Sequence, residues 1–214
     1  MTSLSLAVGH PTLADRLVNR SLPVDLVLIA AGAAFTAIVS QFQILSWPVA
    51  LTAQTLAVFL VGSFLGCLRG ALSMTLYVLI GALGLPVFGR DLFGIEVLLG
   101  PSGGYILAFI LAAAFTGWVA QRSWDHTLAG AALSFFSATV VVFALALPWC
   151  AVVTDRSLLD TVETGLYPFF GGAVVKAAAA ALIVTFAWRK VASSDLRAAE
   201  RDFASDTLET TDGR

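Results

Sequence analysis

Hydrophobic residues in this chain fall into six long runs that contain almost no charge, separated by short polar segments. The runs cover residues 24–41, 52–68, 70–87, 103–120, 127–147 and 168–188. An α-helix needs about 20 predominantly apolar residues to cross a hydrocarbon core roughly 30 Å thick. The pattern therefore predicts an all-α fold, an integral membrane bundle of six transmembrane helices.

The ends of the runs carry further signals. Only Arg69 and Gly70 separate the second run from the third, so these two runs are predicted to form a tight helical hairpin. Tryptophan is enriched at membrane–water interfaces, and four tryptophans lie near run ends: Trp47, Trp118, Trp149 and Trp188.

Lysine and arginine are distributed unevenly between the connecting segments, and positively charged flanks stay on the cytoplasmic side of a membrane. One set of segments holds only Arg90 and Arg156 and is predicted to be external. The other set includes both termini, is predicted to be cytoplasmic, and holds Arg16, Arg20, Arg69, Arg122, Arg189, Lys190, Arg197, Arg201 and Arg214. We expect a cytoplasmic arm over residues 1–21, a six-helix membrane domain over 22–192 and a polar cytoplasmic tail over 193–214.

Composition agrees with a membrane protein and excludes some other classes. Hydrophobic residues make up 58% of the chain and charged residues 12%, about half the charged fraction of a soluble domain. The net charge of −2 provides no basic surface for nucleic acid. Cys67 and Cys150 are predicted near opposite membrane faces, too far apart for a disulfide. Their spacing relative to His10 and His126 matches no metal motif, so no metal site is expected.

Lys176 is the one basic residue predicted within the hydrocarbon part of a run. A lysine at mid-span costs about 2.5–3.5 kcal/mol and indicates a functional site. Helical spacing puts small residues on the same face, namely Gly172, Ala173, Ala179 and Ala180. We expect no acidic residue inside any span to neutralise this ammonium. A ligand with carboxylate or carbonyl oxygens would suit such a cavity, although a lysine can also extend its ammonium to the interface.

Polar and glycine clusters are predicted at the same outer level as Lys176. Thr52, Gln54 and Thr55 begin the second run, residues 100–105 read Gly-Pro-Ser-Gly-Gly-Tyr before the fourth run, and Gly171 and Gly172 begin the sixth. Irregular backbone at membrane depth is tolerated where protein buries it or where it lines a cavity. Each cluster alone indicates a turn, but their convergence with Lys176 predicts a pocket.

Small residues also recur at helical spacing. Ala30, Ala33, Ala34 and Ala37 form overlapping pairs in the first run, and Gly62, Gly66 and Gly70 follow GxxxG spacing. Such faces allow helices to approach closely. The spacing fits packing within the chain, and it also fits an exposed alanine face for a partner subunit.

Several motifs in order resemble those of the BioY family of biotin transporters. Residues 48–56 fit the pattern P-x-x-x-T-x-Q-T-L, and residues 100–105 are close to G-P-T-G-G-Y. Between them lie the stretches Gly70-Ala71-Leu72-Ser73 with Tyr77, and residues 81–88, Gly-Ala-Leu-Gly-Leu-Pro-Val-Phe. The resemblance extends from about residue 24 to residue 190.

The resemblance implies a six-helix subunit with an outward-facing biotin pocket in a prokaryotic cell membrane. It implies partners, a transmembrane coupling protein and two cytoplasmic ATPases, and a coupling contact through Ala30, Ala33, Ala34 and Ala37. No cofactor is expected, because the chain has no phosphate-binding loop motif and only the partners would use ATP. The expected substrate-binding residues are Lys176, Thr52, Gln54, Tyr77, Gly103, Gly104, Tyr105, Trp47 and Gly172.

The last helix departs from the family pattern. Many members read G-D-x-x-K there, with the aspartate and the lysine facing biotin, whereas residues 172–176 here read Gly-Ala-Val-Val-Lys. The lysine role passes to Lys176, but Ala173 replaces the aspartate. Either another acceptor serves the ureido N–H groups, or the ligand lies differently.

Two other functions fit parts of the sequence. Gly100-Pro101-Ser102-Gly103 matches the G-x-S-G pattern of intramembrane serine proteases, with Ser102 as the nucleophile. Such a serine needs a base within hydrogen-bond reach, and both histidines are predicted on the other side of the membrane, which leaves Lys176. A carrier for another small vitamin, or a purely structural subunit, is the remaining alternative. The prediction is a transporter without catalytic residues.

Overall fold

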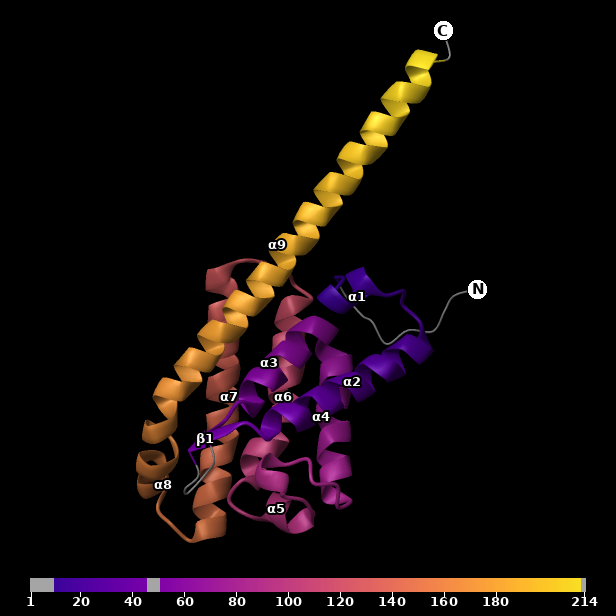
Figure 1. Cartoon of the computed structure of the whole chain (residues 1–214). Helices are drawn as coiled ribbons and strands as arrows, with labels where there is room; N and C mark the ends of the chain where they lie inside the picture. The colour runs from indigo at the N-terminus through magenta and orange to yellow at the C-terminus, as the bar shows by residue number, and fades with distance from the viewer. Residues whose placement is uncertain (1–9, 46–50, 213–214) are drawn as a thin grey trace.

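The structure is a computed structural model that describes residues 10–45 and 51–212. Within this part of the chain, six longer helices form the bundle: α2 (Leu22–Ser40), α3 (Gln54–Leu65), α4 (Cys67–Ala82), α6 (Gly103–Ala120), α7 (Leu128–Thr154) and α9 (Tyr167–Asp212) (Figure 1). The short helices are α1 (Leu13–Leu17), α5 (Ile95–Leu99) and α8 (Leu158–Gly165), with 3-10 turns η1 (Gly89–Asp91) and η2 (Trp124–His126). Strands β1 (Gln43–Leu45) and β2 (Leu51–Thr52) form a small antiparallel hairpin between α2 and α3.

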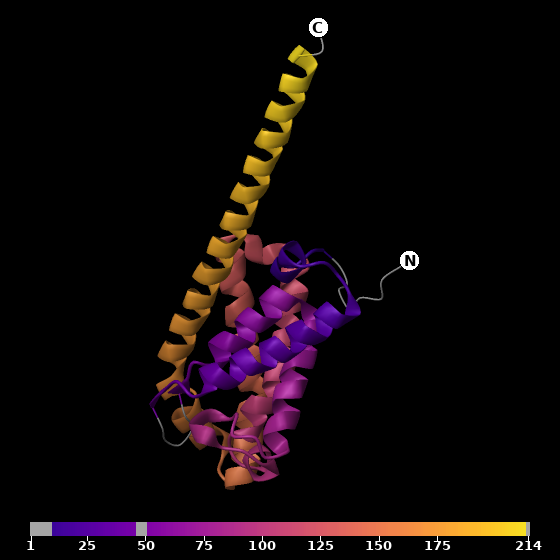
Figure 2. The same cartoon turned by 45° about the vertical axis from the view of Figure 1, so that its right-hand side comes forward.

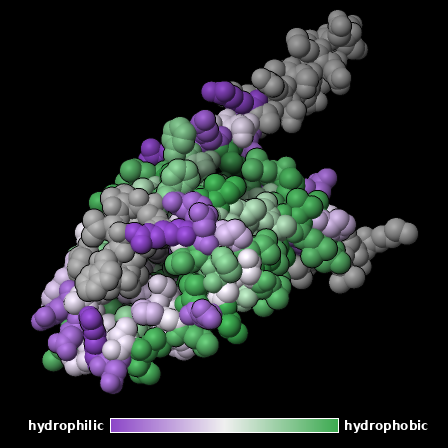
Figure 3. All heavy atoms as spheres, turned by 60° about the horizontal axis from the view of Figure 1, so that its bottom comes forward, coloured by the Kyte–Doolittle hydropathy of each residue, from purple (hydrophilic) through white to green (hydrophobic). Residues whose placement is uncertain are grey.

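Each predicted apolar run coincides with one of the six longer helices. Four of the helices, α2, α6, α7 and the first part of α9, are long and apolar enough to cross a membrane. Helices α3 and α4 have only 12 and 16 residues, so at 1.5 Å per residue they span about 18 and 24 Å. The all-α prediction is confirmed apart from the small hairpin. Many large hydrophobic side chains are exposed, and on the face that Figure 3 shows the green, apolar ones lie among purple, polar ones. Exposed apolar side chains in this number are typical of a membrane protein.

Glycines allow α3, α4 and α6 to meet at the centre of the bundle. Gly66 joins α3 to α4 with φ of +91°, a conformation that favours glycine. A Cβ at Gly62 would collide with the backbone of Ala113 on α6, and one at Gly70 would lie 2.9 Å from the Gly62 Cα. The GxxxG spacing therefore serves packing within the chain, one of the two uses that the sequence allowed.

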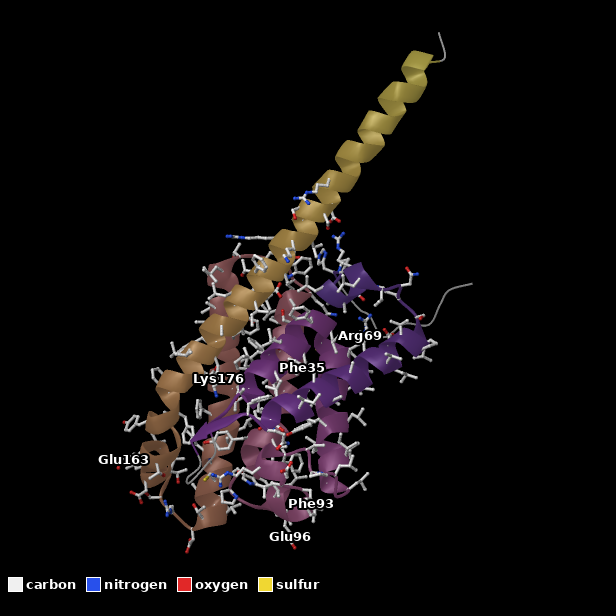
Figure 4. All side chains as sticks on the ribbon, in the orientation of Figure 1. Phe35, Arg69, Phe93, Glu96, Glu163 and Lys176 are labelled. Carbon is white, nitrogen blue, oxygen red and sulfur yellow. The ribbon has the colours of Figure 1, made fainter. Side chains whose placement is uncertain are left out.

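Arg69 lies in the first turn of α4 and is buried, with 2% of its side chain exposed (Figure 4). Its guanidinium contacts Asp15 from α1, with 2.7 Å between Nη2 and Oδ1, and Asp25 from α2, with 2.9 Å between Nε and Oδ1. The burial and pairing of Arg69 were not predicted from its place among the basic flanks. The expectation of no acidic residue inside a span is wrong, because Asp25 is fully buried in the first turn of α2.

The described residues near both ends of the chain form helices. In the N-terminal segment, Leu13 and Ala14 of α1 are buried, and α1 contacts α3 and α9. Burial alone would raise the pKa of Asp15, but hydrogen bonds from Thr12 and Arg69 lower it below its usual value. At the other end, α9 continues without interruption to Asp212 and extends well beyond the bundle (Figures 1 and 2).

Candidate functional site

A partly open cavity of about 100 Å³ lies among α3, α6, α7, α9 and the segment that follows α4. Its polar lining comes from Gln54, Thr55, Ser102, Thr139 and Lys176. The rest of the described lining is mostly aromatic and aliphatic: Phe88, Gly89, Leu92, Val97, Tyr105, Ile106, Phe109, Val142, Phe143, Phe169 and Ala173. An apolar wall with a few polar groups is the usual composition of a small-molecule site.

Lys176 reaches this cavity from α9, beside α7 (Figure 4). Of the small residues predicted on its helix face, Ala173 is 8% exposed and lines the cavity with Lys176, and Ala180 is fully buried. The structure thus directs the side chain into the protein, rather than to an interface. Gly172 is half-buried and is not among the described lining residues.

Gln54 belongs to a chain of hydrogen bonds that fixes one wall of the cavity. The Gln54 Nε2 donates to the Tyr77 hydroxyl at 2.6 Å, and this hydroxyl donates to the Val87 carbonyl at 3.0 Å. The Tyr77 ring also packs edge-on against Phe88, with 5.5 Å between centroids. Tyr77 itself does not line the cavity in the described structure. Its position is that of a residue that holds Gln54 and Phe88 in place.

Tyr105 lines the cavity and connects three helices. It lies in the first turn of α6, its ring packs edge-on against Phe143 of α7 at 6.1 Å, and its hydroxyl donates to the Gly165 carbonyl of α8 at 3.2 Å. This bond orients the ring at the wall of the cavity.

Gly103 and Gly104 have packing roles beside the cavity, and neither is among its described lining residues. A Cβ at Gly103 would collide with the Leu98 carbonyl of α5, and one at Gly104 would lie 2.6 Å from the Trp149 Cβ of α7. Trp149 also donates its indole N–H to the Gly100 carbonyl at 3.0 Å. The glycine motif therefore lets α5 and α7 close around the start of α6.

Two predicted residues fall wholly or partly beyond what the structure describes. Trp47 lies outside the described residues, as does the beginning of the motif over residues 48–56. The backbone of Thr52 ends β2, pairs with Gln43 and lies just before α3.

The aromatic wall was not predicted from the sequence. Phe88, Phe109, Phe143 and Phe169 line the cavity, yet the chain has 15 phenylalanines and most lie in apolar runs. The sequence contains no signal that separates phenylalanines facing a cavity from those facing lipid.

The predicted alanine face of α2 is only partly accessible. Ala30 and Ala34 are exposed and Ala37 is half-buried, but Ala33 is 2% exposed and belongs to the core. Ala33 is therefore not accessible in this conformation, and the contact of these alanines with a partner stays a prediction. Phe35, labelled in Figure 4, lines an apolar groove of about 270 Å³ between α2, α3 and α9.

Ser102 lines the same cavity as Lys176, whereas neither histidine does. His126 ends η2, beyond the other end of α6, and the 18 residues of α6 span about 27 Å. No histidine is thus within reach of Ser102 as a base.

This fold and site define a class, a helical membrane protein that encloses a small, largely apolar pocket with a cationic group in its wall. Comparison with known proteins is specific. A model of the BioY family matches residues 13–193, and the chain belongs to this family.

Curated relatives cover most of the chain. The protein named "Biotin transporter BioY" in Rhizobium etli is 32% identical over 169 residues, which cover 74% of this chain and 90% of the relative. The Thermotoga maritima protein of the same name is 35% identical over 159 residues, covering 73% and 92%. The predicted resemblance is confirmed. Membership of a family of transporters supports the prediction that the chain is not an enzyme, and nothing in the comparisons supports a serine hydrolase.

A solved structure shares the fold. It is described as the S-component for biotin from an ECF-type ABC transporter, with a TM-score of 0.68 and 23% sequence identity. The match covers 76% of this chain and 89% of that one.

Proposed function

We propose that this protein takes up biotin as the substrate-specific subunit of an energy-coupling factor transporter. The observation that carries the proposal is the cavity: a chain of the BioY family encloses an apolar, aromatic-walled site that contains Lys176 and Gln54. Biotin combines an apolar bicycle and aliphatic chain with a ureido group and a carboxylate, which suits such a lining.

The cavity supports distinct roles for its polar residues. The Lys176 ammonium would pair with the carboxylate or the ureido carbonyl oxygen of biotin, since charge-assisted hydrogen bonds are the strongest available here. Ala173, at the position of the family aspartate, supplies no acceptor. Gln54, Thr55 and Ser102 line the same cavity and carry oxygens that could accept from the ureido N–H groups. We also propose Trp47, Thr52, Gly103, Gly104 and Gly172 as substrate-binding residues, and Tyr77 would position Gln54.

Biotin entry requires the cavity to widen. Its volume of about 100 Å³ is below the range of about 300–1,000 Å³ that is typical of ligand sites. Phe88, Gly89 and Leu92 line it from the irregular segment between α4 and α5, which can move without breaking a long helix. We infer that this segment opens toward the outside for biotin to enter.

The proposal includes topology and partners. We infer six crossings, with α3 and α4 as the short ones, a membrane domain over residues 22–192, and cytoplasmic ends over 1–21 and 193–214. The plasma membrane of a prokaryote is the proposed location. A transmembrane coupling protein and two ATPases would supply the energy. Ala30 and Ala34, two of the exposed alanines of α2, could contact the coupling protein.

Titration of the purified full-length protein with a panel of small vitamins tests this function. We expect that, among the vitamins of the panel, biotin and no other binds saturably. We also expect uptake of biotin by cells that contain the chain together with the coupling module. Binding of another vitamin instead of biotin would support the alternative carrier. No binding of any vitamin would contradict the proposal.

A further inference from the structure

A second hollow lies at the opposite end of α6 from the cavity. It is a groove of about 420 Å³ between α6, η2 and α7. Phe115, Val119 and Leu133 form its apolar part, and Ser123, Thr127 and Ser134 contribute hydroxyls. Leu133 is 67% exposed, so the groove opens to the surroundings of the bundle. We call this hollow the α6–α7 groove.

One end of the α6–α7 groove carries an aromatic and cationic cluster. Trp124 lines the groove, and its ring packs edge-on against Trp118, with 6.2 Å between centroids. The Arg122 guanidinium lies 3.6 Å above the Trp118 ring. Both tryptophans are exposed, at 40% and 59%. Exposed tryptophans are typical of the membrane–water interface, so this end lies at the level of lipid headgroups while Phe115 and Leu133 lie toward the acyl chains.

Ser134 lacks the hydrogen bond that a buried hydroxyl normally makes. It is 4% exposed, and its Oγ has no hydrogen-bond partner among the described residues. A serine within a helix usually bonds the carbonyl four residues before it, as Thr116 and Thr139 do here. An unsatisfied buried polar group costs about 1–3 kcal/mol. A ligand with an acceptor oxygen inside the groove would remove this cost.

The positive charge of Arg122 is not neutralised by the nearby Asp125. Asp125 is 1% exposed and accepts a hydrogen bond from Ser63 of α3 at 2.5 Å, so its carboxylate faces the bundle interior. Thr127 accepts from the Gly130 N–H and retains its own hydroxyl proton as a donor. Arg122 does not line the groove itself, but it lies on Trp118 next to the rim residue Trp124, so a cation and hydroxyl donors are available to an anion at this end.

We propose that the α6–α7 groove binds one anionic phospholipid from the leaflet at the η2 end of the bundle. The acyl chain lies along Phe115, Val119 and Leu133, an ester carbonyl accepts from Ser134, and the phosphate contacts Arg122 with the hydroxyls of Ser123 and Thr127. The order along the groove, apolar, then hydroxyl, then cationic, matches a lipid from tail to headgroup. This site is separate from the proposed biotin pocket.

Native mass spectrometry of the full-length protein in detergent, with added phosphatidylglycerol or phosphatidylcholine, tests the proposal. We expect one phosphatidylglycerol to be retained at least ten-fold more strongly than phosphatidylcholine. Arg122→Gln should abolish this preference, and Ser134→Leu, which fills the groove, should weaken retention of both lipids about ten-fold. Arg189→Gln, an exposed arginine on α9, serves as the matched control and should behave as the wild type.

Equal retention of the two lipids by the wild-type protein would overturn the proposal. So would an Arg122→Gln variant that keeps the preference, whatever the behaviour of Ser134→Leu. Thermal unfolding of each variant in the same detergent identifies any variant that has lost its fold. Arg122 is exposed, so its substitution leaves the bundle core intact and keeps the test decisive.

Discussion

Two parts of the bundle each hold a basic side chain inside the protein, and the surroundings of the two side chains differ. Arg69 is 2% exposed and is enclosed by two carboxylates of the chain itself, Asp15 and Asp25. Lys176 instead lines a cavity whose wall is mostly aromatic and aliphatic. A closed ion cluster fixes helices relative to one another, whereas a cation beside a cavity is positioned to meet a ligand. The comparison teaches that burial of charge alone does not identify a binding site; an adjacent cavity does.

The largest effect is expected on stability, at the Arg69 cluster. Arg69→Gln removes the cation that the buried Asp15 and Asp25 share and leaves Asp15 paired with the more exposed Arg20. Removal of one partner of a buried ion pair costs about 3–5 kcal/mol. The midpoint of thermal unfolding in detergent should fall strongly. Arg189→Gln, at an exposed position, should change stability by less than about 0.5 kcal/mol. If the two variants unfold alike, Arg69 does not hold this end together.

At Lys176, the effect should appear in the affinity for biotin. Lys176→Ala removes a charge-assisted hydrogen bond of about 1.5–3 kcal/mol, which corresponds to a roughly 10- to 100-fold weaker affinity for biotin. Calorimetric titration measures this change. Lys190→Ala, at an exposed position on the same helix, should bind biotin as the wild type does. Undiminished affinity of Lys176→Ala would refute the proposed site.

A smaller loss of affinity for biotin is expected from Tyr77→Phe. This change removes the hydroxyl that accepts from Gln54 and donates to Val87, a loss of about 1 kcal/mol and a roughly five-fold weaker affinity for biotin. Thr75→Val on the same helix removes a hydroxyl that bonds only the carbonyl of Ala71, and should leave affinity unchanged. Equal affinities for both variants would show that Tyr77 does not position the wall.

The smallest expected effects are changes of stability with pH, which have opposite signs for Asp125 and Asp15. Burial raises the pKa of Asp125 despite the hydrogen bond from Ser63, so its charged form is disfavoured in the folded state. Its contribution to stability therefore falls as pH rises above about 4. The lowered pKa of Asp15 has the opposite effect: its contribution to stability is present above about pH 4 and is lost as the pH falls below that value.

Between about pH 3 and 7, rising pH should thus make Asp125→Asn gain stability relative to the wild type, mostly above about pH 4, and make Asp15→Asn lose it, mostly below about pH 5, each by about 1 kcal/mol. Thermal unfolding across this pH range measures both differences. Differences of the same sign would contradict the assigned environments.

Much of the fold follows from the apolar runs, because each bundle helix must present an apolar surface to lipid. The short lengths of α3 and α4 could not be predicted, since Gly66 and the irregular segment after Ala82 end them earlier than their hydrophobicity requires. The Arg69 cluster also escaped prediction. Its ion pair with Asp15 joins residues 54 positions apart, and no local spacing encodes such a contact.

The candidate site could be predicted in its polar part only. Lys176, Gln54 and Tyr105 were found because a cation, an amide and a glycine motif are conspicuous in apolar runs, and all three line the cavity. Gly103 and Gly104 were placed in the same wall for a related reason, but their missing side chains serve helix packing. Residue type indicates the chemistry, whereas only tertiary packing decides which side of a helix meets the cavity.

The most direct test of the central claim uses the fact that the chain has only two lysines, Lys176 and Lys190. The full-length protein is treated with an amine-selective reagent, with and without saturating biotin, and modification of each lysine is followed by mass spectrometry. If Lys176 lines a biotin pocket, biotin slows its modification at least ten-fold and leaves the rate at Lys190 unchanged. Equal rates at Lys176 with and without biotin, under conditions where biotin is bound, would contradict the account.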